Sequence, residues 1–270
     1  EWGRKVPAPL FLYKKAGGKG DFKMKYQRPH KLKYGKWGLI FILPFFIAYG
    51  IFNLYPLIMT FYNSFFSKYE DLFDTVVQFV GFDNYIRLFK DELFGKAFLN
   101  TLKFVVIVVP LQLGGALLLA LGINKVTYCK KYFKVAFFIP VVMSLAVVST
   151  LWMQLYNPEG LLNTILNSFG IASQPFIYGK EQALEAISIM SIWQGMGYQM
   201  IIFLGGLQAI SPSLYEAAEI DSASEWKKFL NVTLPELKPI TIYILLTITI
   251  GAFKLIVQPM VMTGGGPAFS

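Results

Sequence analysis

The sequence predicts an all-α polytopic membrane protein, and three observations support that fold class. Of the 270 residues, 55% are hydrophobic and 15% are charged, whereas a soluble domain carries about 25% charged residues. Apolar runs of about 20 residues recur, each long enough to cross the hydrocarbon core of a bilayer. Lysines and arginines gather beside these runs. Backbone in lipid must satisfy its own hydrogen bonds, and the runs are much longer than barrel strands, so we expect helices.

Five stretches are predicted to span the membrane, because each is close to the length that a helix needs. In chain order they cover residues 37–62, 99–123, 133–156, 184–208 and 240–262. No internal repeat, low-complexity tract or long Gly/Ser linker divides them. We therefore expect one transmembrane domain over 37–270.

The segment before the first span has two parts. Residues 12–17 read LYKKAG, which resembles the translated scar of a recombination-cloning vector, and no apolar core like that of a signal peptide precedes the first span. We take 1–20 as a vector-derived or disordered tail, with a natural basic tail as the alternative. Residues 21–36 form a basic tail expected in the cytoplasm, with Lys25, Arg28, Lys31, Lys33 and Lys36.

The loops predict an orientation for the bundle. The loop between the second and third spans contains Lys125, Lys130, Lys131 and Lys134 without an acid, which is typical of the cytoplasmic side. In contrast, the loop over 156–183 has Lys180 as its only basic residue, and the loop between the first two spans is acidic on balance. Both are expected outside. With a cytoplasmic N-terminus, alternation returns 209–239 to the cytoplasm.

Several function classes are disfavoured by composition. The net charge of +9 comes from cations that flank the spans, which favours membrane topology over a nucleic-acid partner. Cys129 is the single cysteine and His30 the single histidine, so neither an internal disulfide nor a His/Cys metal cluster is available. We see no constellation of residues for an enzyme active site.

One cytoplasmic segment carries a family resemblance. Residues 216–223 read EAAEIDSA and are followed by Phe229, Val232, Leu234, Pro235 and Pro239. This resembles the EAA loop of binding-protein-dependent importers: E-A-A, two residues, D-G-A, five residues, F, two residues, an aliphatic, one residue, L-P, three residues, P. Every listed position fits except Ser222, where the family has glycine, a residue that eases a turn through special backbone angles.

The resemblance covers about residues 36 to 270 and implies a permease subunit in the bacterial inner membrane with a type I importer-like bundle. Such bundles have a six-helix core, so a sixth span is expected after Ser270. The implied partners are a second permease subunit, an ATP-binding-cassette ATPase dimer and an external substrate-binding protein. No G-x-x-x-x-G-K-[ST] loop occurs in this chain, so ATP and Mg²⁺ are expected in the partner ATPase.

The loop 211–239 is expected to couple this chain to the ATPase. Ser213 with Glu216 and Ser222 with Glu225 fit the S-x-x-E capping box, which predicts two short helices joined near Ser222, the second ended by Pro235. An amphipathic helix-turn-helix on the membrane is the alternative. The resemblance implies that the coupling residues are Glu216, Ala217, Ala218, Asp221, Ser222, Leu234 and Pro235.

A sugar is the expected cargo, because the T-G-G-G-P sequence at 263–267 is similar to the exit from the fifth core span in maltose-type and glycerol-phosphate-type permeases. The glycine run itself is interpreted as a helix-terminating loop. The alternatives are another solute, such as glycerol phosphate, an amino acid or an oligopeptide, and an ATP-independent transporter or channel.

Polar residues inside spans mark candidate positions along a cargo pathway. On the fourth span they share one helical face, and on the fifth they recur at helical spacing. Helix packing is the competing explanation for each residue. The candidates are Ser191, Gln194, Gly195 and Tyr198 on the fourth span, and Gly251, Lys254 and Gln258 on the fifth.

Overall fold

The computed structural model describes residues 35–70 and 75–266, and its contacts divide the chain into two compact units, 1–84 and 85–270. The predictions for the tail 1–20 and for most of 21–36 lie outside the described residues.

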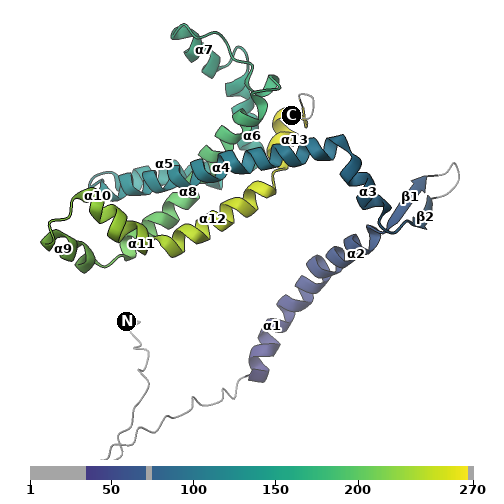
Figure 1. Ribbon diagram of the computed structural model, residues 1–270, viewed down its shortest axis with the longest axis horizontal. Coiled ribbons are helices and arrows are strands. Elements are labelled where there is room, and N and C mark those ends of the chain that lie inside the picture. Colours follow the sequence, from purple (N-terminus) through teal and green to yellow (C-terminus); the bar gives the residue numbers. More distant parts are fainter. Residues whose placement is uncertain (1–34, 71–74, 267–270) are drawn as a thin grey trace, which may run out of the picture. The chain divides into compact units, whose positions relative to one another are not determined.

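The first unit contains one long helical run and a hairpin (Figure 1). The run consists of α1 (Gly35–Tyr49), the π-helical η1 (Gly50–Leu54) and α2 (Tyr55–Asn63). Pro56 lies in the first turn of α2 and has no N–H to donate, so the wide π turn lets the run continue through it. The stretch Gly38–Asn63 is long and apolar enough to cross a membrane, as predicted for 37–62.

The hairpin is a feature that the all-α prediction missed. Strands β1 (Phe66–Glu70) and β2 (Thr75–Phe79) pair antiparallel, with Phe66 opposite Phe79. The Asn84 amide nitrogen donates to the carbonyl oxygens of Ser64 and Phe66 at 2.9 and 3.0 Å. These bonds close the end of the hairpin next to α2.

The second unit is helical (Figure 1). After α3 (Asp83–Lys90), which begins at the boundary between the units, its long helices are α4 (Glu92–Lys125), α5 (Lys130–Val142), α6 (Leu145–Tyr156), α8 (Ala183–Ala209) and α12 (Lys238–Phe253). Its shorter elements are α7 (Leu161–Ser168), η2 (Phe176–Tyr178), α9 (Pro212–Ile220), α10 (Glu225–Lys228), η3 (Phe229–Thr233), α11 (Leu234–Glu236) and α13 (Val257–Thr263).

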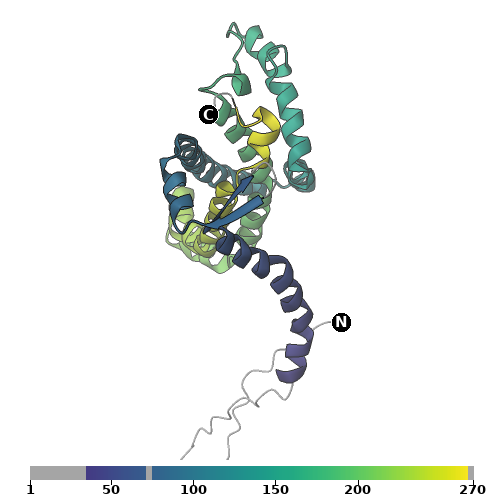
Figure 2. The same ribbon diagram turned by 90° about the vertical axis from the view of Figure 1, so that its right-hand side faces the viewer.

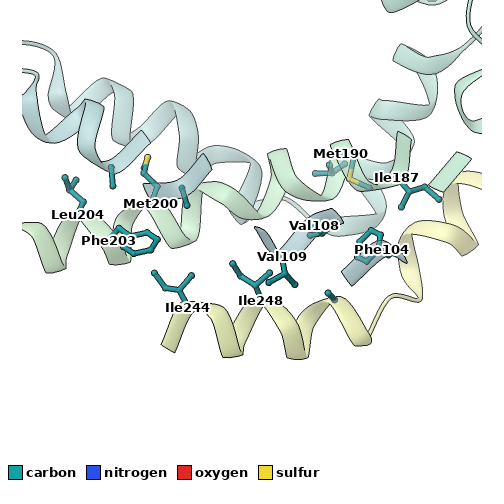
Figure 3. Close-up of a cluster of buried hydrophobic side chains, with 14 of the residues drawn as sticks. Phe104, Val108, Val109, Ile187, Met190, Met200, Phe203, Leu204, Ile244 and Ile248 are labelled. Carbon is teal, nitrogen blue, oxygen red and sulfur yellow. The ribbon is translucent and has the colours of Figure 1, made fainter. Parts of the chain in front are cut away.

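The core of this unit lies where α4 packs on α8, with α12 against α4 and α5 against α8. Phe104, Val108, Met190 and Phe203 are buried there, and Figure 3 shows their side chains between the helices. Lipid is as apolar as these side chains, so close packing rather than escape from water stabilises the contact. Ala116, with no exposed surface, keeps the helices close.

Helices α4 and α8 run parallel. Lys96 lines one cavity with Lys180, near the start of both helices, whereas Lys125 lines another with Leu207, near the end of both. Parallel second and fourth spans are what the alternating topology requires. The loop after α4 and the loop after α8 therefore lie at the same end of the unit.

The third and fifth predicted spans are not single helices, so the prediction of continuous helices over 133–156 and 240–262 was wrong. Helix α5 ends at Val142, and the helices on either side of the break differ in direction by 101°. Helix α12 ends at Phe253, and α13 resumes at Val257 and packs on α6 (Figure 2, the yellow segment beside the green helices). Within residues 35–70 and 75–266, three helices can span a membrane, or five if each of two bent pairs counts as one span.

Candidate functional site

The candidate coupling loop begins with α9, whose N-cap is Ser211 and whose first helical residue is Pro212. Proline is favoured there because the first N–H of a helix has no partner within it. The predicted capping box at Ser213 was wrong: Ser213 lies inside the helix, and its Oγ is 2.7 Å from Ser211 Oγ. With Pro212 as its first residue, the helix starts two residues earlier than the box implied.

Helix α9 ends in a Schellman motif. The Ala223 N–H donates to the Ala218 carbonyl and the Ser222 N–H donates to the Glu219 carbonyl, both at 2.9 Å. These are the two bonds that define the motif, in which the first residue after the C-cap adopts the left-handed conformation. That residue is Ser222, with φ +55°. The glycine that the EAA pattern has at this position is therefore explained by backbone geometry, and serine holds the same turn at a conformational cost.

The second half of the loop departs from the prediction. Ser224, not Ser222, caps α10, and its hydroxyl accepts from the Lys227 N–H at 3.4 Å. Pro235 does not end the helix: it follows the π-helical η3, and the run continues to Glu236 before the chain bends at Leu237. The axes of Glu225–Glu236 and Lys238–Phe253 differ by 66°. We take α12 as the span and α10–α11 as part of the loop.

Most predicted coupling residues are exposed on the surface of the loop. Glu216, Ala217 and Asp221 are exposed, and Ala218 is half-buried. Ile220, which the sequence argument did not single out, is 84% exposed. This surface therefore offers small, acidic and apolar groups to a protein partner. The remaining predicted coupling residues, Ser222, Leu234 and Pro235, are also exposed.

Two side-chain contacts that the sequence argument missed join α9 to the second half of the loop. Lys228 Nζ lies 2.8 Å from Glu219 Oε1 and 3.0 Å from Glu225 Oε1. The Tyr215 hydroxyl lies 2.8 Å from Thr233 Oγ1. The hydrogen bonds from Lys228, first to Glu219 and then to Glu225, raise the pKa of its ammonium group. The four-residue spacing of Tyr215 and Glu219 was the available signal, but it does not reveal their partners.

The four candidate pathway residues of the fourth span lie on α8, which is one continuous helix. They nevertheless have different surroundings. The Ser191 hydroxyl is buried and donates to the Ile187 carbonyl in the preceding turn at 2.8 Å. Gly195 packs against the Gln112 side chain of α4. Ser191 is therefore bonded within its own helix, and Gly195 lies where α8 packs on α4.

Gln194 and Tyr198 lie at less crowded positions. The Gln194 amide nitrogen is 3.4 Å from the Pro140 carbonyl oxygen, which is among the carbonyls left without a helical partner at the end of α5. Tyr198 is 43% exposed, and its hydroxyl lies near that of Tyr243 on α12. This part of the face therefore combines amide, phenol and exposed aromatic surface.

The candidates on the fifth span do not share one helical face, because the break after α12 separates Gln258 from the other two. Lys254 is the C-cap of α12, and its side chain is exposed. A cation is favoured there by the negative end of the helix dipole. Gly251 is also exposed, and Gln258 is half-buried in α13. Helix α13 ends at Thr263 and is capped by Gly264, whose φ is +60°, as predicted for the glycine run.

No group of three or more His, Cys, Asp or Glu side chains arranged to hold a metal ion occurs among the described residues.

The sequence matches a family and a set of named relatives. The family model for the inner membrane component of binding-protein-dependent transport systems matches residues 130–269. An arabinooligosaccharide transport permease of Bacillus subtilis is 34% identical over 230 residues, which cover 83% of this chain and 71% of the relative. A lactose transport permease of Rhizobium radiobacter is 33% identical, covering 89% and 81%. An sn-glycerol-3-phosphate transport permease of Agrobacterium fabrum is 33% identical, covering 85% and 78%.

Two solved structures have the same fold. One is a chain of a bacterial ABC transporter that imports the acidic polysaccharide alginate, with a TM-score of 0.71 and 27% identity, covering 84% of this chain and 77% of that one. The other is a chain of an alginate transporter in complex with a periplasmic protein that carries an alginate pentasaccharide, with a TM-score of 0.70 and 27% identity, covering 88% and 80%.

Proposed function

This chain belongs to the family of inner membrane components of binding-protein-dependent transport systems, and from that membership we propose that it carries a sugar or oligosaccharide inward as the permease subunit of an ATP-driven importer. It is an integral protein of the inner membrane and a transport subunit rather than an enzyme. The observation that carries the cargo assignment is the likeness, over more than four-fifths of the chain, to permeases named for arabinooligosaccharides and lactose.

The proposed assembly contains a second permease subunit, two ATPase modules and an external substrate-binding protein. The alginate transporter of similar fold is bound to a periplasmic protein that holds its oligosaccharide. We propose that ATP and Mg²⁺ bind to the ATPase modules alone, and that the exposed side of α9 contacts one of them. Glu216, Ala217 and Asp221 are the contact residues, since Ala217 leaves the helix backbone accessible to a close partner.

We propose that the N-terminus and the loop 211–239 lie in the cytoplasm. The parallel course of α4 and α8 supports this proposal, because it places the loop after each helix at the same end of the unit. Cysteines introduced at Glu216 and Ala217 are expected to crosslink to the ATPase in the whole complex. Labelling of either cysteine from outside intact cells would overturn the orientation.

For the cargo pathway, we propose the surface around Gln194 and Tyr198, with Ser191, Gly195, Gly251, Lys254 and Gln258 as the remaining candidates. An amide and an exposed phenol supply the hydrogen bonds and the aromatic surface that a sugar ring needs. Purification of the complex from native membranes, followed by uptake into proteoliposomes, is the test. An ATPase and a second permease should copurify, and uptake should require ATP and the external binding protein.

Glycerol phosphate is the second candidate cargo, because one relative of equal identity is named for it. The same proteoliposomes discriminate the two. Uptake of a labelled oligosaccharide that excess glycerol 3-phosphate does not inhibit supports the sugar assignment. Uptake of glycerol 3-phosphate alone would replace it.

A further inference from the structure

Helix α9 is attached to the rest of its unit by very little. Within the described residues it packs extensively on no other helix. A cavity of about 760 Å³ opens between the loop and the ends of α4 and α8, and its lining includes Leu118, Leu207 and Tyr215. Helix α9 therefore has no extensive interface with the bundle in the described part of the chain, and its contact with the buried core comes from the ring of Tyr215.

Two polar contacts within the loop join α9 to η3 and to the last residue of α10, and they lie one helical turn apart. Tyr215 and Glu219 are four residues apart on α9, so they occupy neighbouring positions on one face. Their partners are Thr233, which is 5% exposed, and Lys228, whose side chain is 13% exposed. The earlier residue on α9, Tyr215, contacts the later partner, Thr233, and Glu219 contacts the earlier partner, Lys228. This is the pairing order of an antiparallel helical hairpin.

The π-helical turn of η3 sets the register of these partners. Lys228 and Thr233 are five residues apart, and in an α-helix such residues point about 140° apart. In η3 the Leu234 N–H donates to the Phe229 carbonyl, five residues back. This wider turn brings residues five apart to neighbouring positions. The turn therefore places Lys228 and Thr233 toward the same side, where both contact α9.

We propose that the Tyr215–Thr233 hydrogen bond and the Glu219–Lys228 ion pair form a two-point brace that makes α9 move as one body with η3 and the start of α12. The four residues are positioning residues for coupling between ATP hydrolysis and transport. This inference rests on the proposed function. Through the brace, displacement of α9 by the ATPase reaches Leu237, which has no exposed surface, and then the fifth span.

The test uses Tyr215→Phe and Glu219→Gln, singly and together, in the whole importer. Each removes one contact and keeps the size of the side chain. We expect solute transported per ATP hydrolysed to fall on the order of two- to tenfold in the double variant, with the subunit composition of the complex unchanged. Wild-type transport per ATP in the double variant overturns the brace.

Glu225→Gln is the matched control. It also removes a carboxylate partner of Lys228, but that partner lies on α10 and does not cross to α9. Coupling should stay at the wild-type value. If Glu225→Gln lowers transport per ATP as much as Glu219→Gln does, the proposal is overturned. The neutralised charge around Lys228, and not the ion pair between α9 and α10, would then be responsible. A wild-type importer without solute-stimulated ATPase activity contradicts the proposed function instead.

A second measurement keeps the inference testable where a variant disrupts assembly. Spin labels at Glu216 and Asn231, both exposed, report the distance between α9 and η3 in the full chain with Cys129→Ser. The wild-type distribution should be narrow, and Tyr215→Phe with Glu219→Gln should broaden it. An equally narrow distribution in both proteins overturns the brace.

Discussion

Gly197→Ala tests the close crossing of α5 and α8. A Cβ atom at Gly197 would overlap the Phe137 carbonyl oxygen, and it would lie 2.8 Å from the carbonyl carbon and 3.2 Å from Val141 Cγ2. Carbon atoms in contact are about 3.5–4.0 Å apart, so α5 must move by about an ångström or more. Backbone cannot swing aside as a side chain can. Overpacking of this kind costs about 1–3 kcal/mol.

Because the obstacle is backbone, we take the upper part of that range, about 2–3 kcal/mol. The same substitution gains about 1 kcal/mol of helix propensity, so the net loss in the free energy of unfolding should be about 1–2 kcal/mol. Gly205→Ala is the control on the same helix, because nothing lies within 4 Å of a Cβ there. Thermal unfolding in detergent should give a Tm lower by about 2–8 °C for Gly197→Ala and an unchanged or higher Tm for Gly205→Ala. Equal values for the two variants would refute the crossing geometry.

Three further predictions concern single sites. Ser222→Gly should be more stable than Ser222→Ala by about 1 kcal/mol, because φ is +55° there and alanine pays the left-handed penalty; equal Tm values would contradict the Schellman turn. Asn163→Ala should speed proteolysis of the loop 157–182, since Asn163 has no exposed surface and its amide bonds the Asn157 and Gln174 backbone, whereas Asn167→Ala, at an exposed position, should not. Gln194→Leu removes the donor to the Pro140 carbonyl, which should cost about 1 kcal/mol and lower the Tm by about 2–4 °C; an unchanged Tm would count against that bond.

The helices that the sequence predicted best are those with an uninterrupted apolar run. The first, second and fourth predicted spans lie within single helical runs, because composition and length decide whether a chain enters lipid. The breaks at Ser144 and Lys254 were missed. Both occur inside apolar stretches, where hydropathy stays high although the backbone leaves the helix. Pro140 gave a partial signal, but proline is tolerated in membrane helices when neighbours satisfy the freed carbonyls.

The coupling loop was predicted in outline and wrong in its details. The EAA pattern indicated two helices meeting near Ser222, and the Schellman turn confirms the junction. The capping serines were misassigned because Ser211, Ser213, Ser222 and Ser224 give overlapping cap patterns. The π-helical turn at 229–233 has no local sequence signature. The partners of Tyr215 and Glu219 depend on that turn and were therefore beyond a sequence argument.

The polar residues of the spans show why cargo and packing roles are hard to separate by one substitution. Gln194 satisfies the Pro140 carbonyl, so Gln194→Ala would impair transport either by removing a cargo contact or by loosening the break between α5 and α6. Tyr198 is not linked to the break between α5 and α6: its side chain is exposed and lies near that of Tyr243 on α12. Tyr198→Phe therefore alters the exposed face and leaves the break intact. A transport defect common to Tyr198→Phe and Gln194→Ala indicates the face, whereas a defect confined to Gln194→Ala indicates the break.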